Sequence, residues 1–192
     1  MTAPTYVIEN PVTGERAIFP LVAAEATTDA LRFDLFARPG GFVVGANEHI
    51  HPHQDEHFLV KAGTLRLRMG GGERDYGVGE EATVPAGTPH VWWNAGADEL
   101  HAIVELRGRS AGRFIPPVTS FFALAQAGKT DGKGGPNLLR SAVILFEYRD
   151  VLCAAPLFVQ RVLVPPLAFL GRLLGYRPDV PYPPDGSETR AA

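Results

Sequence analysis

The sequence predicts a mainly β protein of the sandwich or barrel type, followed by a helical C-terminal part. Up to about residue 109, short runs rich in Val, Ile, Phe and Leu alternate with turn residues at close spacing. Glycine and proline are frequent, with 21 and 17 residues, and both residue types interrupt long helices. Beyond residue 109 the apolar residues change to helical spacing.

Ten short strands are expected in the first part of the chain, separated by turn signals such as Pro39-Gly40-Gly41 and Gly70-Gly71-Gly72. The expected strands are Tyr6–Glu9, Ala17–Pro20, Leu31–Ala37, Phe42–Ile50, His57–Lys61, Thr64–Met69, Arg74–Val78, Ala82–Val84, Val91–Trp93 and Glu99–Leu106.

Two helices are expected over residues 114–127 and 138–150, because apolar residues recur there at helical spacing. Residues 151–175 are strongly apolar, but polar residues and prolines interrupt them, whereas a membrane span needs about 20 consecutive apolar residues. This segment therefore favours helical hairpins packed on the barrel or on a second subunit. Peripheral membrane contact is the alternative, with Arg161 and Arg172 at lipid headgroups.

The overall composition limits the classes of binding partner and the cellular compartment that are expected. The net charge of -3 and the pI near 6.1 give no basic field for nucleic acid, so no nucleic-acid partner is expected. The first 19 residues lack a basic stretch followed by an apolar core, so no signal peptide is expected and the cytoplasm is the expected compartment. The one cysteine, Cys153, cannot form an internal disulfide, and its apolar neighbours indicate a buried, unreactive thiol.

Four of the six histidines fall within nine residues, at positions 49, 51, 53 and 57. Side chains alternate along a strand, so His49 and His51 point to the same side, about 7 Å apart. Two imidazoles at that spacing can converge on one metal ion. If the chain turns at residues 52–55, Glu56 returns a carboxylate to the same point. The alternative interpretation is an exposed histidine-rich patch that binds metal loosely.

This segment resembles the first motif of the cupin superfamily, which is Gly, five residues, His-x-His, three or four residues, Glu, six residues, Gly. His49, His51, Glu56 and Gly63 match the motif in order. The chain departs from it at the opening glycine, where Val43 stands instead.

A second register starts from Gly45 and uses His51 and His53, but it leaves only two residues before Glu56. The first register is preferred because the leading glycine binds no metal, whereas the position of the glutamate depends on the turn. His53 stays as an alternative ligand or as a group that orients a ligand.

The second motif of the superfamily is Gly, five residues, Pro-x-Gly, two residues, His, three residues, Asn. Gly79, Pro85, Gly87, His90 and Asn94 fill all of its positions. Proline and glycine favour the tight bend between two strands, because proline presets φ and glycine tolerates a positive φ. The resemblance implies that His90 is the fourth ligand of the metal.

The resemblance also implies an antiparallel jelly-roll barrel, often dimeric, so a homodimer is expected. We expect a barrel domain over residues 1–110, with the core that carries the motifs at 30–107. A helical extension over 111–177 and a disordered tail over 178–192 are expected to follow. The minimal cupin has no counterpart of the extension.

Three imidazoles and one carboxylate leave one or two open positions on an octahedral ion, which favours Fe or Mn, with Ni, Co or Zn as substitutes. The inward faces of the strands are expected to place Phe58, Val60 and Trp92 in the cavity beside the metal. His101, on the last strand, is either a group beside the metal or a surface histidine.

The first functional hypothesis is a metal-dependent oxidoreductase of the dioxygenase type, acting on a small organic substrate inside the barrel. Catalytic residues other than the ligands are not assigned. The alternatives are a non-catalytic small-molecule-binding cupin with a structural metal, and a cupin isomerase. The fold alone does not choose among them, because one barrel hosts many chemistries.

Overall fold

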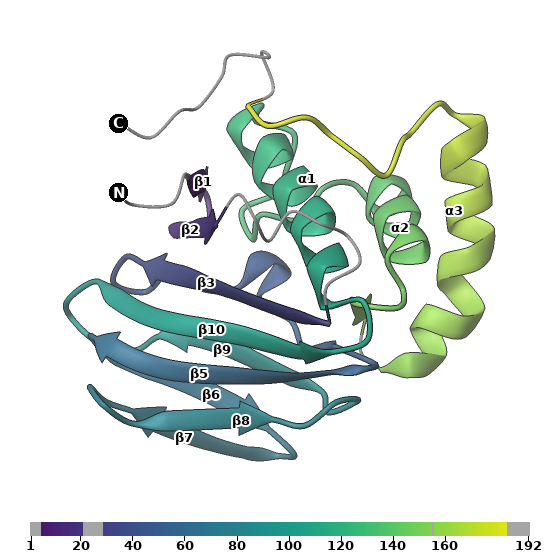
Figure 1. The fold of residues 1–192 in the computed structure, drawn as a ribbon. Coiled ribbons are helices and arrows are strands. Elements are labelled where there is room, and N and C mark those ends of the chain that lie inside the picture. Colours follow the sequence, from purple (N-terminus) through teal and green to yellow (C-terminus); the bar gives the residue numbers. More distant parts are fainter. Residues whose placement is uncertain (1–4, 21–28, 155, 184–192) are drawn as a thin grey trace.

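The fold is known from a computed structural model that describes residues 5–20, 29–154 and 156–183. Within these residues, eleven strands form two antiparallel sheets, which face each other as a barrel. Three α-helices follow the barrel and gather on one side of it (Figure 1). The predicted fold class, an antiparallel cupin-type barrel with a helical C-terminal extension, is confirmed.

The larger sheet has the strand order β1-β2-β3-β10-β5-β8 and the smaller sheet β11-β4-β9-β6-β7. The larger sheet contains β1 (Thr5–Asn10), β2 (Glu15–Pro20), β3 (Ala30–Ala37), β10 (Leu100–Gly108), β5 (Gln54–Ala62) and β8 (Glu81–Val84). The smaller sheet contains β11 (Cys153–Ala154), β4 (His49–Ile50), β9 (His90–Asn94), β6 (Leu65–Met69) and β7 (Gly72–Tyr76).

The core fills the space between the sheets, because apolar side chains alternate with polar ones along the strands. Phe58 and Val60 on β5 are fully buried, and the rings of Phe19 and Phe33 lie 4.7 Å apart between their centroids. The same apolar cluster continues into the first helix through Phe122. The helical part therefore shares one core with the barrel.

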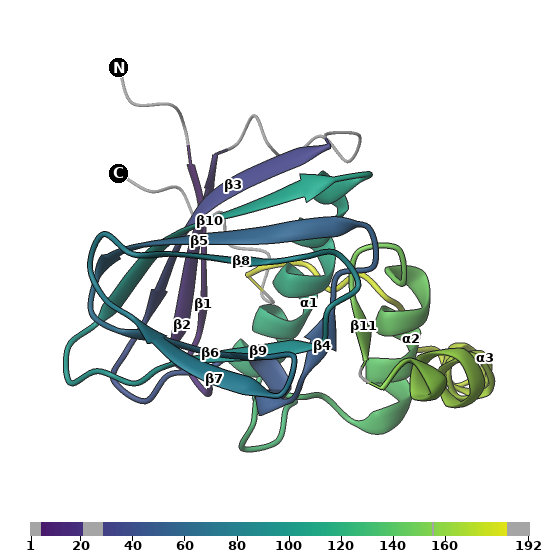
Figure 2. The same cartoon turned by 90° about the horizontal axis from the view of Figure 1, so that it is seen from below.

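The helical part begins directly after β10. Its elements are η3 (Ala111–Phe114), α1 (Ile115–Gln126), α2 (Leu138–Glu147), the short π-helix η4 (Val159–Leu163) and α3 (Val164–Leu173). Helix α1 lies beside β1, whereas α2 and α3 stand farther out, with α3 outermost (Figures 1 and 2). At Gly171 a Cβ atom would come within 2.7 Å of Val143 and 2.8 Å of the Leu139 carbonyl, so glycine permits the close approach of α3 to α2.

The strand predicted over Phe42–Ile50 is wrong. Val44–Ala46 form the 3-10 turn η2, and only His49–Ile50 pair as a strand. Gly45 and Ala46 have φ values of 84° and 49°, which extended backbone excludes. The chain therefore makes a turn immediately before the histidines.

The helical hairpins predicted over residues 151–175 are also wrong. Cys153–Ala154 form the strand β11, and the following residues form η4 and α3 as consecutive helical turns. Pro165 lies at the start of α3, directly after the π-helical turns of η4. Among the described residues, the helices fall short of the length and apolar character that crossing a bilayer requires.

The expected disordered tail begins with contacts to the fold. The rings of Tyr182 and Tyr6 meet edge to face with 6.2 Å between centroids, and the Val180 N–H donates to Ser120 Oγ at 3.0 Å. Residues 184–192 lie outside the described residues, so for them disorder stays a prediction.

Two glycines of the motifs provide a matched test of the barrel's turns. Gly63 and Gly79 both have positive φ, 74° and 83°, but only at Gly63 would a Cβ atom meet backbone, 2.8 Å from the Glu99 carbonyl. Gly79→Ala should lower the free energy of unfolding by about 1–2 kcal/mol, the cost of the left-handed conformation. Gly63→Ala should cost a further ~1–3 kcal/mol from the clash. Urea denaturation measures both, and equal losses would contradict the steric explanation.

Candidate metal centre

The two motif segments meet at one end of the barrel. Strand β4 pairs with β9 so that His49 lies opposite His90, while β5 brings Glu56 across from the other sheet. His51 follows β4 directly after the buried Ile50. Because β4 is only two residues long, its position depends on its neighbours β9 and β11.

Four side chains converge at this point, and we call them the His–Glu cluster. The cluster consists of His49, His51, Glu56 and His90, with one ligand atom from each residue lying within 4.8 Å of all the others. His90 Nε2 lies 2.8 Å and His51 Nε2 3.8 Å from Glu56 Oε2. His51 and His90 are 2% and 0% exposed, so the cluster is a buried site rather than a surface patch.

Backbone carbonyls determine which ring nitrogen faces the cluster. Nδ1 of His51 lies 2.6 Å from the Val151 carbonyl, and Nδ1 of His90 lies 3.0 Å from the Thr88 carbonyl. A carbonyl only accepts, so Nδ1 carries the proton in each ring. Each ring therefore turns Nε2 toward the cluster, and this is the nitrogen that binds a metal ion when the ring is neutral.

His51 Nε2 is buried and has no hydrogen-bond partner among the described residues. A buried polar atom without a hydrogen-bond partner destabilises the folded state. A role as a metal ligand accounts for this nitrogen. Together with two more imidazoles and a carboxylate, this nitrogen makes a donor set that fits a divalent metal ion.

The electrostatics favour metal-binding protonation states at three of the four residues, and His90 is the exception. Burial alone would lower the pKa of His90, but its hydrogen bond to Glu56 outweighs burial, so that pKa is raised. Burial lowers the pKa of His49, and the nearby His90 and His51 lower it further. Burial also lowers the pKa of His51. Burial alone would raise the pKa of Glu56, but His51 and His90 outweigh it, so that pKa is lowered and the carboxylate stays charged.

The bend of the second motif is tied to the first motif by hydrogen bonds. The Gly87 N–H donates to the His51 carbonyl at 2.8 Å, and the Ala86 N–H donates to Asp55 Oδ1 at 2.8 Å. At the other end of β9, the buried Asn94 donates to the Ala37 carbonyl at 2.9 Å. The motif residues that bind no metal therefore hold the strands that carry the ligands.

His53 and His101, the alternative candidate ligands, lie outside the His–Glu cluster. His53 is exposed and stands outside the cluster, so the geometry favours the register that uses His49 and His51. His101 lies on β10 beside Asp34, with its Nε2 2.7 Å from Asp34 Oδ1, and its ring stacks on Phe36. His101 is thus a partly exposed histidine away from the metal centre.

A cavity of about 590 Å³ opens beside the cluster, and His49 and Glu56 belong to its lining. Trp92 lines it as expected, whereas Phe58 and Val60 are buried in the core and do not. Most of the wall is apolar and comes from both the barrel and the helical part. The wall includes Phe33, Leu35, Val43, Trp92, Val104, Phe114, Val118, Phe121, Phe122, Leu145, Leu152 and Cys153.

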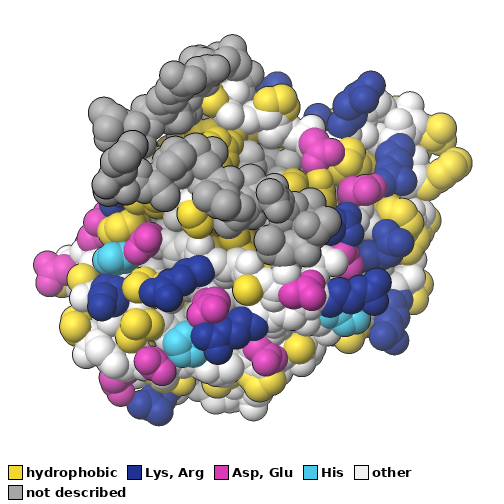
Figure 3. Space-filling view, viewed as in Figure 1, with side chains coloured by type: hydrophobic (Ala, Val, Ile, Leu, Met, Phe, Trp, Pro, Cys, Tyr) yellow, Lys and Arg dark blue, Asp and Glu magenta, His cyan; other side chains and the backbone are white. Residues whose placement is uncertain are grey.

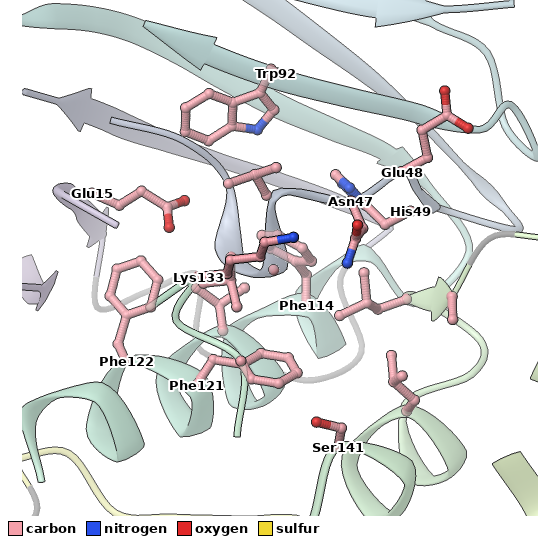
Figure 4. Close-up of a pocket in the computed structure, with 18 of the residues that line it drawn as sticks. Glu15, Asn47, Glu48, His49, Trp92, Phe114, Phe121, Phe122, Lys133 and Ser141 are labelled. Atoms are coloured by element: carbon pink, nitrogen blue, oxygen red, sulfur yellow. The ribbon is translucent and has the colours of Figure 1, made fainter. Parts of the chain in front are cut away.

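Four ionisable side chains of the cavity were not predicted from the sequence, namely Glu15, Glu48, Asp131 and Lys133. Figure 4 shows Glu15 at one end, Asn47 and His49 at the other, and Lys133 projecting between them. Burial raises the pKa of Glu15 to about 8, against the opposing hydrogen bonds from Thr13 and the Val44 backbone, so Glu15 is mostly protonated at neutral pH. Glu15 and Lys133 are remote from the motifs in sequence, and no local pattern marks them.

The helical extension completes the site. Strand β11 adds to the edge of β4, pairing Ala154 with His49 and Cys153 with Ile50. The Cys153 side chain lines the cavity, and burial raises the pKa of its thiol to about 11. The thiol is therefore protonated at neutral pH and serves as packing.

The sequence model described as Cupin domain matches residues 37–104, a range that includes both motifs and the whole His–Glu cluster. This chain contains a cupin domain. The strands β1 and β2 and the helical part lie outside the matched range, so the cupin match covers the metal centre but only part of the cavity wall.

Solved structures resemble this chain only distantly. A sugar phosphate isomerase of the cupin superfamily from Silicibacter pomeroyi is 22% identical over 55% of this chain and 69% of that chain, with a TM-score of 0.43. KdgF from Halomonas is 19% identical over 50% and 82%, with a TM-score of 0.41. The DMSP lyase DddQ from Ruegeria pomeroyi is 25% identical over 42% and 40%, with a TM-score of 0.37. No curated protein matches, and likenesses at this level assign no activity to this chain.

The cluster can be tested directly by metal titration. Glu56→Gln should weaken the binding of Co(II) or Ni(II) at least about tenfold, because it removes the one anionic donor. His53→Gln is the matched control, since His53 lies three residues from Glu56 but is exposed. The metal affinity of this variant should equal that of the wild type. Titration calorimetry measures both. Unchanged binding in Glu56→Gln, or lost binding in His53→Gln, would contradict the assignment.

Proposed function

We propose that this protein is a metal-dependent oxidoreductase of the dioxygenase type that acts on a small organic molecule in the cavity. Its metal is Fe(II) or Mn(II), held by the His–Glu cluster. The observation that carries the proposal is that the cluster lies at the wall of a largely apolar cavity, with His49 and Glu56 on the lining.

The ligand set supports catalysis rather than a purely structural metal. A divalent ion with three imidazoles and one carboxylate keeps one or two coordination positions open, and this open coordination is the chemistry that it supplies. His51 and His90 are oriented by their bonds to backbone carbonyls. Trp92 and Phe114 limit the access of water to the same space.

Lys133 is the cation among the ionisable side chains of the lining, which also include the carboxylates of Glu48 and Asp131, so we expect a largely apolar substrate that carries one acidic group. The Lys133 ammonium offers a cation to that group, while Glu15, mostly protonated at neutral pH, offers a hydrogen-bond donor. The aromatic wall between them suits an aromatic or aliphatic body.

An isomerase is the second candidate, and Glu15 is the observation that favours it. A buried carboxyl group with a pKa of about 8 can take up and release protons near neutral pH without any oxidant. A non-catalytic binding protein with a structural metal is the third candidate. The three candidate functions differ in whether they require O₂ and in whether the bound molecule is chemically converted.

Loading the purified protein with Fe(II) under anaerobic conditions, then adding O₂ and a panel of aromatic, thiol and diketone acids, tests the proposal. At least one of these substrate classes should cause O₂ consumption, measured with an oxygen electrode. Glu56→Ala should abolish it, whereas His101→Gln, remote from the cluster, should retain it. Conversion in the absence of O₂ would instead support the isomerase, and ligand retention without turnover would support the binding protein.

The role of Lys133 predicts a preference for acids over their amides. Lys133→Met should reduce that preference about five- to tenfold, because a charge-assisted hydrogen bond is lost. Lys129→Met is the matched control in the same loop, as Lys129 does not line the cavity. Quenching of tryptophan fluorescence can follow binding, since Trp92 lines the cavity. An unchanged preference in Lys133→Met would contradict this substrate class.

A further inference from the structure

The outer face of η4 and α3 is apolar and exposed. Among the described residues, seven of the nine exposed large hydrophobic side chains fall within residues 158–174. We call them the α3 face. The α3 face consists of Phe158, Val162, Leu163, Phe169, Leu170, Leu173 and Leu174.

The distribution of side chains on α3 is the reverse of that on an ordinary surface helix. The buried residues of α3 are Val164, Ala168 and Gly171, which are small or medium-sized, and they pack against α2. The large apolar residues face outward, where a helix that only covers a core carries polar residues. Exposed large apolar side chains gathered on one helix in this way mark an interaction site.

The charges around the α3 face are positive. Residues 138–177 contain five arginines against two acidic residues, although the whole chain has a net charge of -3. Residues 151–178 contain three of these arginines, Arg161, Arg172 and Arg177, and no acidic residue. Figure 3 shows yellow and dark blue side chains side by side at the right-hand margin, where Figure 1 places α3.

We propose that the α3 face binds the surface of an anionic lipid bilayer, with η4 and α3 lying parallel to it. The large apolar side chains enter the boundary between headgroups and acyl chains. Arg161 and Arg177 contact the lipid phosphates, while Arg172 is partly neutralised by Glu147, which accepts its hydrogen bond at 2.6 Å. The helix rests on the membrane and does not cross it.

A second copy of the chain fits this surface less well. A two-fold symmetric contact places the same patch on both subunits. Arg161 and Arg177 would then face a partner segment, residues 151–178, that contains three arginines and no acidic residue, while the neighbouring Glu147 is already paired with Arg172. Anionic lipid headgroups supply the missing negative charge.

Flotation with extruded vesicles tests the proposal, using the full chain with phosphatidylcholine alone and with phosphatidylcholine and phosphatidylglycerol at 7:3. The protein should float with the anionic vesicles in 0.05 M NaCl and be largely released in 0.5 M NaCl. Leu173→Asp should lower the partition coefficient at least about tenfold, because it removes buried apolar area and adds a like charge. Arg161→Gln with Arg177→Gln should lower it roughly five- to twentyfold for the anionic vesicles only.

Val78→Asp is the matched control, since Val78 and Leu173 are both 68% exposed but Val78 lies on the barrel near β7 and β8. It should bind vesicles as the wild type does. All of these variants change exposed residues, and equal urea midpoints verify that each is folded. The proposal is overturned if the wild type does not float with anionic vesicles, or if Val78→Asp and Leu173→Asp lose binding equally. It is also overturned if light scattering shows that Leu173→Asp converts a dimer to a monomer.

Discussion

The hydrogen bond from His51 Nδ1 to the Val151 carbonyl, 2.6 Å long, joins the barrel's His–Glu cluster to the helical extension. Two further contacts act across the same boundary. Strand β11 pairs with the two-residue strand β4, and the buried Gln54 side chain donates to the Asp150 carbonyl at 3.1 Å. Because β4 is too short to hold its position alone, the segment around Val151 fixes the tautomer of His51 and the positions of His49 and His51. The extension is therefore part of the site and not an appendage to it.

The same geometry couples metal binding to stability. Three imidazoles and a carboxylate are packed in an apolar interior, where an unpartnered polar atom such as His51 Nε2 destabilises the fold. An ion that satisfies these atoms binds only the folded state, so it stabilises that state. The helical part contributes to the same region, because side chains of α1 and of the segment after α2 line the cavity beside the His–Glu cluster. The His–Glu cluster and the cavity wall therefore both depend on the contacts between the barrel and the helical part.

The sequence predicted much of this arrangement where local pattern determines structure. Alternating apolar residues located most strands, and the spacing of the two motifs indicated the residues that converge in the cluster. The strand over Phe42–Ile50 failed because Gly45 adopts a left-handed conformation, which hydrophobicity does not reveal. Strand β11 was missed because two residues carry no periodicity. Glu15 and Lys133 meet only through tertiary packing, so neither could be assigned from its neighbours in sequence.

The central claim is that the His–Glu cluster holds a divalent ion with an open position facing the cavity. Crystals of the full chain grown with Mn(II) and measured at a wavelength with strong manganese anomalous scattering test it most directly. We expect one anomalous peak, about 2.0–2.3 Å from a nitrogen of each of His49, His51 and His90 and from a Glu56 oxygen. The remaining coordination positions should point into the cavity. No peak at the cluster, a peak at His53 or His101 instead, or an ion without cavity-facing positions would contradict it.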